Sequence, residues 1–145
     1  MILKIIIPGD AKAQDRPRGA NVNGHVVFYD TKESKEFKNI VAIYGKAAMI
    51  EQNWEYVGPN IPVKFHVNVY FEITKSDRKS KKWMEEFRQG KKRPTKKPDD
   101  DNLLKICQDA LNKILYHDDS QVVSGCCDKW YTEGAPYTEI IIEVL

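Results

Sequence analysis

The sequence predicts an α+β (mixed α/β) fold in which helices pack on one face of a single mixed β-sheet. Apolar and polar residues alternate over 63–72, as in a strand with one buried face. Apolar residues recur at three- and four-residue spacing over 37–48 and 104–114, as in amphipathic helices. Residues rich in β-branching occupy 2–7 and 138–145, which indicates a strand near each end of the sequence.

The first half of the chain is expected to run strand, loop, strand, helix. Residues 2–7 form a strand that Pro8-Gly9 ends, and we interpret it as an edge strand. Residues 8–24 are rich in Gly, Pro and Asn and are interpreted as a long loop, which in a compact domain is either functional or disordered. A short strand over 25–29 and a helix over 32–53, capped by Asp30 or Thr31, follow.

The second half is expected to add a strand over 63–71, a short helix within 81–89 and an amphipathic helix over 101–115. Two further strands are expected over 121–131 and 138–145, separated by a Gly-Ala-Pro turn. The predicted order is therefore β-β-α-β-(α)-α-β-β.

Length and composition bound the class of protein. The 145 residues suit a single domain over 1–145, and 41% hydrophobic with 30% charged residues excludes a disordered chain. No apolar run approaches the roughly 20 residues of a membrane span, and the short apolar start lacks the features of a signal peptide. We therefore expect a cytoplasmic protein. The three cysteines show neither a disulfide framework nor a C-x-x-C zinc spacing, and Cys107 falls on an apolar helix face.

Charge is distributed unevenly although the net charge is only +2. Residues 75–97 hold eleven Lys or Arg against three acidic residues, and a cluster of aspartates follows directly. Such a basic segment can bind phosphates without reading base sequence. The candidate DNA-binding residues are Arg16, Arg18, Lys79, Lys81, Lys82, Lys92, Arg93, Lys96 and Lys97.

The aspartates after Pro98 have the chemistry of a metal site. Pro98 favours extended backbone before it, so Asp99 is expected to end an extended segment and Asp101 to lie at or near the cap of the next helix. Residues i and i+2 of an extended chain point the same way, which would let Asp99 and Asp101 converge on a Mg²⁺ ion. Lys105, one helical turn after Asp101, would lie beside that ion.

Asp118 and Asp119 follow the helix, and one of them could complete the metal shell. Each signal also has an ordinary alternative. Asp101 could be a simple helix cap, Asp118-Asp119 a solvated turn, and the Asp101–Lys105 pair a common helix-surface pair. The basic segment could be a solvated loop. Asp109 lies roughly 12 Å along the helix from Asp101, which makes it a doubtful ligand for the same ion.

The central segment resembles the signature of the RusA family of Holliday junction resolvases. That signature is P-D-x-D-N-x-x-K, then D-A-L, then D-D-x-Q-[VI]. The sequence has Pro98-Asp99-Asp100-Asp101-Asn102-Leu103-Leu104-Lys105, then Asp109-Ala110-Leu111, then Asp118-Asp119-Ser120-Gln121-Val122. The order agrees, and the spacing nearly agrees, over about 25 residues. Arg16-Pro17-Arg18 is a weaker match to a basic stretch of the family, and Asp100 stands where family members commonly have an apolar residue.

The resemblance implies a RusA-like fold and a homodimeric endonuclease that cuts four-way DNA junctions with Mg²⁺ during recombination and repair. Carried over by position, Asp99, Asp101 and Asp119 are the metal ligands, and these three together with Lys105 are the catalytic residues. The choice of Asp119 over Asp118 as third ligand stays open at this point.

Partners and alternatives follow from the same residues. A two-fold dimer would supply two active sites for symmetric cleavage, with the helix over 32–53 or the strand over 63–71 as candidate interfaces. Trp83 or Phe87 could stack on bases at the junction, or could simply pack the short helix on the core. Alternative functions are a nuclease for other branched DNA and a non-catalytic basic DNA-binding module.

Overall fold

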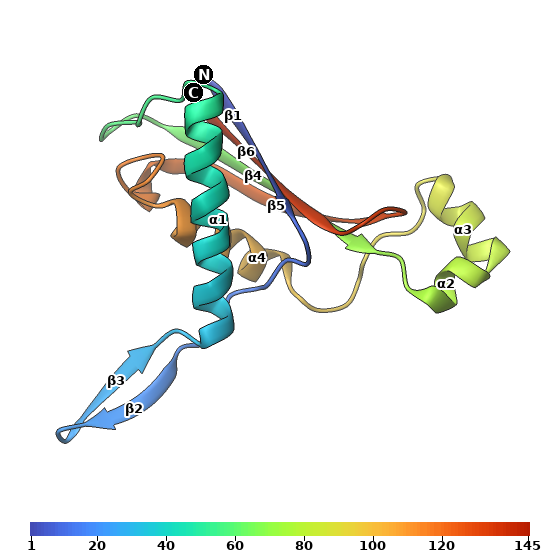
Figure 1. Cartoon of the computed structure of the whole chain (residues 1–145), viewed down its shortest axis with the longest axis horizontal. Coiled ribbons are helices and arrows are strands. Elements are labelled where there is room, and N and C mark those ends of the chain that lie inside the picture. The colour runs from blue at the N-terminus through green and yellow to red at the C-terminus, as the bar shows by residue number, and fades with distance from the viewer.

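A mixed four-stranded sheet with two long helices on one face forms the body of the protein (Figure 1). The computed structural model describes residues 1–145. The strands are β1 (Ile2–Pro8), β2 (Arg18–Val22), β3 (His25–Tyr29), β4 (Val63–Glu72), β5 (Val122–Thr132) and β6 (Tyr137–Val144). The helices are α1 (Lys32–Glu51), α2 (Lys75–Lys79), α3 (Lys81–Arg88) and α4 (Asp100–Leu111), followed by the short 3₁₀ helix η1 (Asp119–Gln121).

The strand order of the main sheet is β1-β6-β4-β5. β6 pairs antiparallel with both β1 and β4, whereas β4 and β5 are parallel. A parallel pair needs a crossover connection, and the crossover from β4 to β5 carries α2, α3, α4 and η1. Figure 1 shows α2 and α3 beyond one end of the sheet. The β2–β3 hairpin projects away from them, next to the first turn of α1.

The core lies between the sheet and the helices α1 and α4, which also pack on each other. Alternate residues of β1 and β6 point into it, such as Leu3, Ile5 and Ile142, each 1% exposed or less. Gly45 of α1 allows the close approach of α4, because a Cβ at this position would come within 2.5 Å of the Leu111 side chain.

The opposite face of the sheet is not covered by any helix. It carries the other alternating residues, among them Lys64, His66 and Tyr70 of β4 and Trp130 of β5, all of them partly or fully exposed. The rings of Tyr70 and Tyr137 stack there with centroids 4.3 Å apart. The sheet therefore has one face buried against the helices and one face exposed to solvent.

The structure confirms the predicted fold class and most predicted elements. The strand at residues 2–8 is an edge strand, as predicted, and Thr31 caps α1 by accepting a hydrogen bond from the Ser34 amide. The prediction of a continuous loop over 8–24 was wrong, because residues 18–22 form β2 and pair with β3. Asn23 and Gly24, both at positive φ, make the hairpin turn.

Two features of the helices also differ from the prediction. The predicted helix 101–115 ends at Leu111, and the separate helix α2 precedes α3 where a loop was expected. Thr74 caps α2, and Ser80 ends it and caps α3, so one serine divides the basic segment into two short helices. None of the helices has both the length and the apolar character that a membrane crossing requires.

Candidate active site

The aspartate cluster occupies the first turn of α4. Asp99 is the N-cap residue with extended backbone, at φ −75° and ψ 147°, while Asp100 and Asp101 are already helical. Asp101 lies near the cap, as predicted, but it is the second helical residue, so the extended-chain argument for its convergence with Asp99 does not apply. Both carboxylates are exposed, and the Asp99 side chain makes no hydrogen bond or ion pair. The helix dipole favours negative charge at this end.

A lysine on the neighbouring strand fixes the segment that leads into this turn. The Lys129 Nζ atom of β5 donates to the carbonyl oxygens of Lys96 and Pro98, at 2.9 Å each. The guanidinium of Arg93 stacks on the Trp130 ring, 3.4 Å from its centroid. Because Lys129 lies about 30 residues away in sequence, no local pattern could have indicated this role.

The N-terminal loop lies alongside the start of α4. The backbone amide of Gln14 donates to the Asn102 carbonyl oxygen at 3.1 Å. Two surface hollows lie here, and both are lined by Gln14, Asp15, Arg16 and Asn102. One hollow extends to Asp99. The Gln14 Oε1 atom is buried without a hydrogen-bond partner, so it is an acceptor that a bound cation or water could satisfy.

The second hollow extends to Lys105 and Asp109 and has no hydrophobic residue in its lining. Lys38 of α1 contacts two acids here, with its Nζ 2.7 Å from Asp30 and 3.8 Å from Asp109. The hydrogen bond from Lys38 holds the pKa of Asp30 below its ordinary value. Lys105 forms no ion pair with Asp101 or any other acid, so its ammonium group remains available to a phosphate.

Asp119, like Asp118, is partly buried. Its Oδ1 accepts a hydrogen bond from the Tyr116 hydroxyl at 3.1 Å, and that hydroxyl also lies 3.2 Å from the Gln108 carbonyl oxygen. Burial raises the pKa of Asp119, and the negative charges of Asp109 and Asp118 raise it further. A nearby cation would relieve this repulsion.

Asp118 has a different environment from its neighbour. It caps η1, and its Oδ2 accepts hydrogen bonds from the amide and the hydroxyl of Ser120, at 3.0 and 2.6 Å. These bonds lower the pKa of Asp118. Gln121 completes the capping box by accepting from the Asp118 amide. Asp118 thus has a structural role as a cap, which leaves Asp119 as the better candidate for a ligand.

The single chain brings some of these residues together and not others. Asp99 and Asp101 share one helical turn, but Asp119 is tied through Tyr116 to Gln108, about 10 Å further along α4. Asp99, Asp101 and Asp119 do not form a group whose carboxylate oxygens all lie within 4.8 Å of one another. Carboxylate oxygens are nevertheless the donors that Mg²⁺ prefers. The donor set fits the ion, and the metal assignment stays a prediction.

The predicted DNA-binding residues lie on three segments. Arg16 and Arg18 are exposed at the base of the hairpin, and Lys79, Lys81 and Lys82 lie on α2 and α3. The remainder precede α4, namely Lys92, Arg93, Lys96 and Lys97.

Two of these residues make contacts within the chain, since Lys92 pairs with Glu86 at 3.1 Å and Arg93 stacks on Trp130. The others form no ion pair with an acidic side chain.

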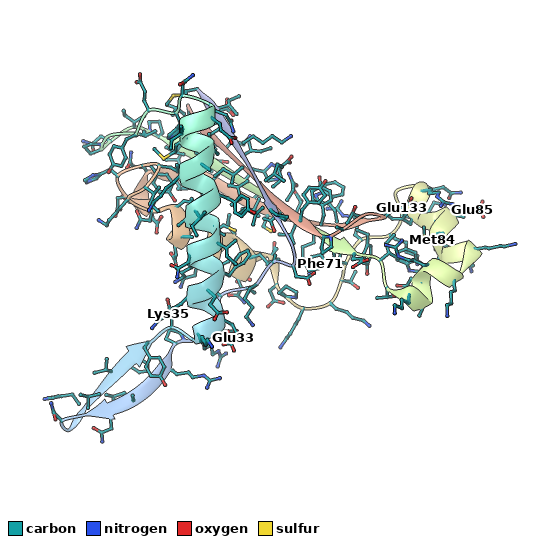
Figure 2. The ribbon with its side chains drawn as sticks, in the orientation of Figure 1. Glu33, Lys35, Phe71, Met84, Glu85 and Glu133 are labelled. Atoms are coloured by element: carbon teal, nitrogen blue, oxygen red, sulfur yellow. The ribbon has the colours of Figure 1, made fainter.

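The helix α3 is anchored to the body of the protein. Trp83 packs edge-on against Tyr131 of β5 and stacks with Phe87, with centroids 5.2 and 5.9 Å apart. Figure 2 shows Met84 and Glu85 of α3 at the same end of the molecule as Glu133, whose carboxylate lies 3.3 Å from Arg88. These contacts favour the packing interpretation of Trp83 and Phe87 over a role in base stacking.

Comparison with protein families identifies the family to which this chain belongs. The family model described as Endodeoxyribonuclease RusA matches residues 8–143. The chain belongs to the RusA family. Membership supports an endonuclease, and hence a hydrolase of DNA.

Two relatives extend the comparison. The Uncharacterized protein YqaN of Bacillus subtilis (strain 168) is 41% identical over 140 residues, covering 97% of this chain and 94% of its own length. The protein named Crossover junction endodeoxyribonuclease rusA of Lactococcus phage r1t is 30% identical over 105 residues. The match covers 70% of this chain and 66% of the phage protein.

The two adjacent aspartates should respond oppositely to replacement by asparagine. The pKa of Asp119 is higher in the folded state than in the unfolded state, so its charge destabilises the fold once the pH exceeds the unfolded-state pKa. In the presence of a chelator at about pH 7, Asp119→Asn should therefore unfold at a higher urea concentration than the wild type. The pKa of Asp118 is lowered, so its stabilising charge is present at about pH 7; Asp118→Asn should unfold at lower urea.

Urea midpoints measured at about pH 7 and about pH 2 check this prediction, because both charge effects should vanish when the carboxyls are protonated. Equal midpoints for the two variants at the higher pH would contradict the assignment of Asp118 as cap and Asp119 as partly buried acid.

Proposed function

We propose that this chain is a Mg²⁺-dependent endonuclease that resolves Holliday (four-way) junctions in recombination and repair, and that it acts in the cytoplasm. The observation that carries the proposal is the family signature at the N-terminus of α4, next to a hollow lined by charged residues. The name of the phage relative, a crossover junction endodeoxyribonuclease, supports four-way junctions as the substrate class.

Asp99, Asp101 and Asp119 would hold the ion, and Lys105 would act on the phosphate. A bound Mg²⁺ would polarise the scissile phosphate and lower the pKa of a water molecule. Lys105 is exposed and free of ion pairs one turn after Asp101, which supports a role in stabilising negative charge on the phosphoryl group. Lys38 pairs closely with Asp30 and more distantly with Asp109, so Asp30 would compete less for a cation.

The basic residues would bind the junction through its phosphates. Arg16 lines the hollow beside Asp99, while Lys96 and Lys97 lead into the same turn. This proximity supports contacts to phosphates flanking the cleaved bond. Lys79, Lys81 and Lys82 lie further away on α2 and α3, where they would bind an adjoining arm of the junction.

We also propose a homodimer, since two symmetric cuts need two active sites. Of the two candidate surfaces, β4 is flanked by β6 and β5 and offers no free edge. α1 exposes large apolar side chains along one side, with Ile43 65% and Ile50 80% exposed. Light scattering should give twice the mass of one chain, and Ile43→Glu together with Ile50→Glu should give the mass of one. A wild-type chain that stays single at assay concentration would contradict the dimer.

Asp101→Asn should abolish cleavage. Labelled four-way junction, flap and linear duplex are incubated with the wild type, with and without Mg²⁺, and the products are separated on denaturing gels. We expect paired nicks on the junction only with Mg²⁺, and a rate at least about 100-fold lower in Asp101→Asn and Lys105→Gln. Asp100→Asn is the matched control and should retain most of the activity, because Asp100 is the signature position that varies in the family.

The same assay separates the alternatives. Faster cleavage of flaps than of four-way junctions would replace junction resolution with another branched-DNA nuclease activity. Binding without cleavage under any divalent ion would indicate a non-catalytic DNA-binding module and would overturn the proposal.

Lys81→Ala should weaken junction binding in a salt-dependent way. Each phosphate contact that is lost lowers the slope of log affinity against log salt by about one. Lys64→Ala is a matched control, because Lys64 is also exposed but lies on the uncovered face of the sheet, outside the basic segment. Binding isotherms at several salt concentrations give the slopes. Identical slopes for Lys81→Ala and the wild type would exclude α3 from the DNA interface.

A further inference from the structure

Three different metal-ligating side chains meet on the uncovered face of the sheet, away from the aspartate cluster. In the parallel register of β4 and β5, His66 lies opposite Cys126. Asp128 is two residues further along β5, so its side chain lies on the same face as that of Cys126. The ligand atoms of His66, Cys126 and Asp128 all lie within 4.8 Å of one another, and theirs is the single group of this kind in the chain.

The chemistry of this group differs from that of the aspartate cluster. A thiolate, an imidazole and a carboxylate form a mixed S, N, O set that suits Zn²⁺, whereas Mg²⁺ takes oxygen ligands. Tetrahedral zinc bonds place ligand atoms roughly 3.5 Å apart. The His66 Nε2 and Asp128 Oδ2 atoms are already 2.8 Å apart, and Cys126 is exposed, so its side chain can rotate toward them.

The neighbouring residues leave these three groups available. The Arg93 Nη2 atom lies 4.0 Å from the Asp128 Oδ1 atom, which leaves Oδ2 directed at His66. Cys127 belongs to the opposite face, where it packs against the core. Cys126 is therefore the thiol that a metal in solvent can reach.

We propose that His66, Cys126 and Asp128 bind a Zn²⁺ ion on the uncovered face of the sheet. Two anionic ligands balance the charge of the ion, and a water molecule takes the fourth position, as in sites with three protein ligands. The ion ties the edge strand β5 to the central strand β4. This site is independent of the proposed Mg²⁺ site, and neither requires the other.

Co²⁺ added to chelator-treated full-length protein tests the proposal, because a cobalt–thiolate bond gives a charge-transfer band in the near ultraviolet. We expect the band in the wild type, and its displacement by one equivalent of Zn²⁺. Cys126→Ser should lose the band, and Cys127→Ser, the matched control on the other face, should keep it. Asp101→Asn should also keep it, which separates this site from the proposed catalytic one.

Zinc affinity measured by competition with a coloured chelator gives a second readout. His66→Gln and Cys126→Ser should weaken Zn²⁺ binding by at least about 100-fold, and Asp128→Asn by about 10-fold or more. Zn²⁺ should raise the unfolding temperature of the wild type but not of Cys126→Ser. The absence of a thiolate band in the folded wild type, or a band that persists in Cys126→Ser, would overturn the proposal.

Discussion

The burial of α4 against the sheet is the interaction on which the candidate active site depends. Leu103, Ile106 and Leu111 are 1% exposed or less, and they fix the helix between α1, β4 and β5. The same burial continues into Leu115 and Tyr116, both fully buried, directly before the second aspartate pair. The hydrophobic effect thus sets the positions of the aspartates at both ends of the helix, even though none of those aspartates contributes to the core.

Electrostatics at the site works against the fold and in favour of a ligand. Partly buried carboxylates at Asp109 and Asp119 repel each other, and Tyr116 supplies one hydrogen bond to Asp119 without any positive charge. Lys38 lies between Asp30 and Asp109 and offsets part of their negative charge. Binding sites often retain such uncompensated negative charge, because the bound cation supplies the positive charge that balances it.

The sequence predicted the elements whose pattern is local and missed those that depend on distant partners. Alternation over β4 and the periodicity of α1 and α4 identified them, because each buries one regular face. β2 was missed because Arg18-Gly19-Ala20-Asn21-Val22 has little strand character and pairs only with the exposed β3. The Asn23-Gly24 turn was the available signal.

The site shows the same division. The signature residues were found from their spacing, whereas the roles of Lys129 and Gln14 depend on contacts across the fold. The cluster of His66 with Asp128 joins residues 62 positions apart, so no C-x-x-C search could detect it. The separation of Asp119 from Asp101 along α4 was likewise hidden, because spacing in sequence does not give the direction of the chain after a helix.

The topology of the sheet has a consequence for how the chain reaches its native state. β1 and β4 are both early in sequence, yet they do not pair with each other; β6 lies between them, and the other neighbour of β4 is β5. Neither strand finds a partner until residues 122–144 have left the ribosome. The backbone edges of β1 and β4 therefore stay unpaired until β5 and β6 have been synthesised, and the main sheet can form only after that point. Long-range pairing of this kind is slow and leaves the nascent chain open to aggregation.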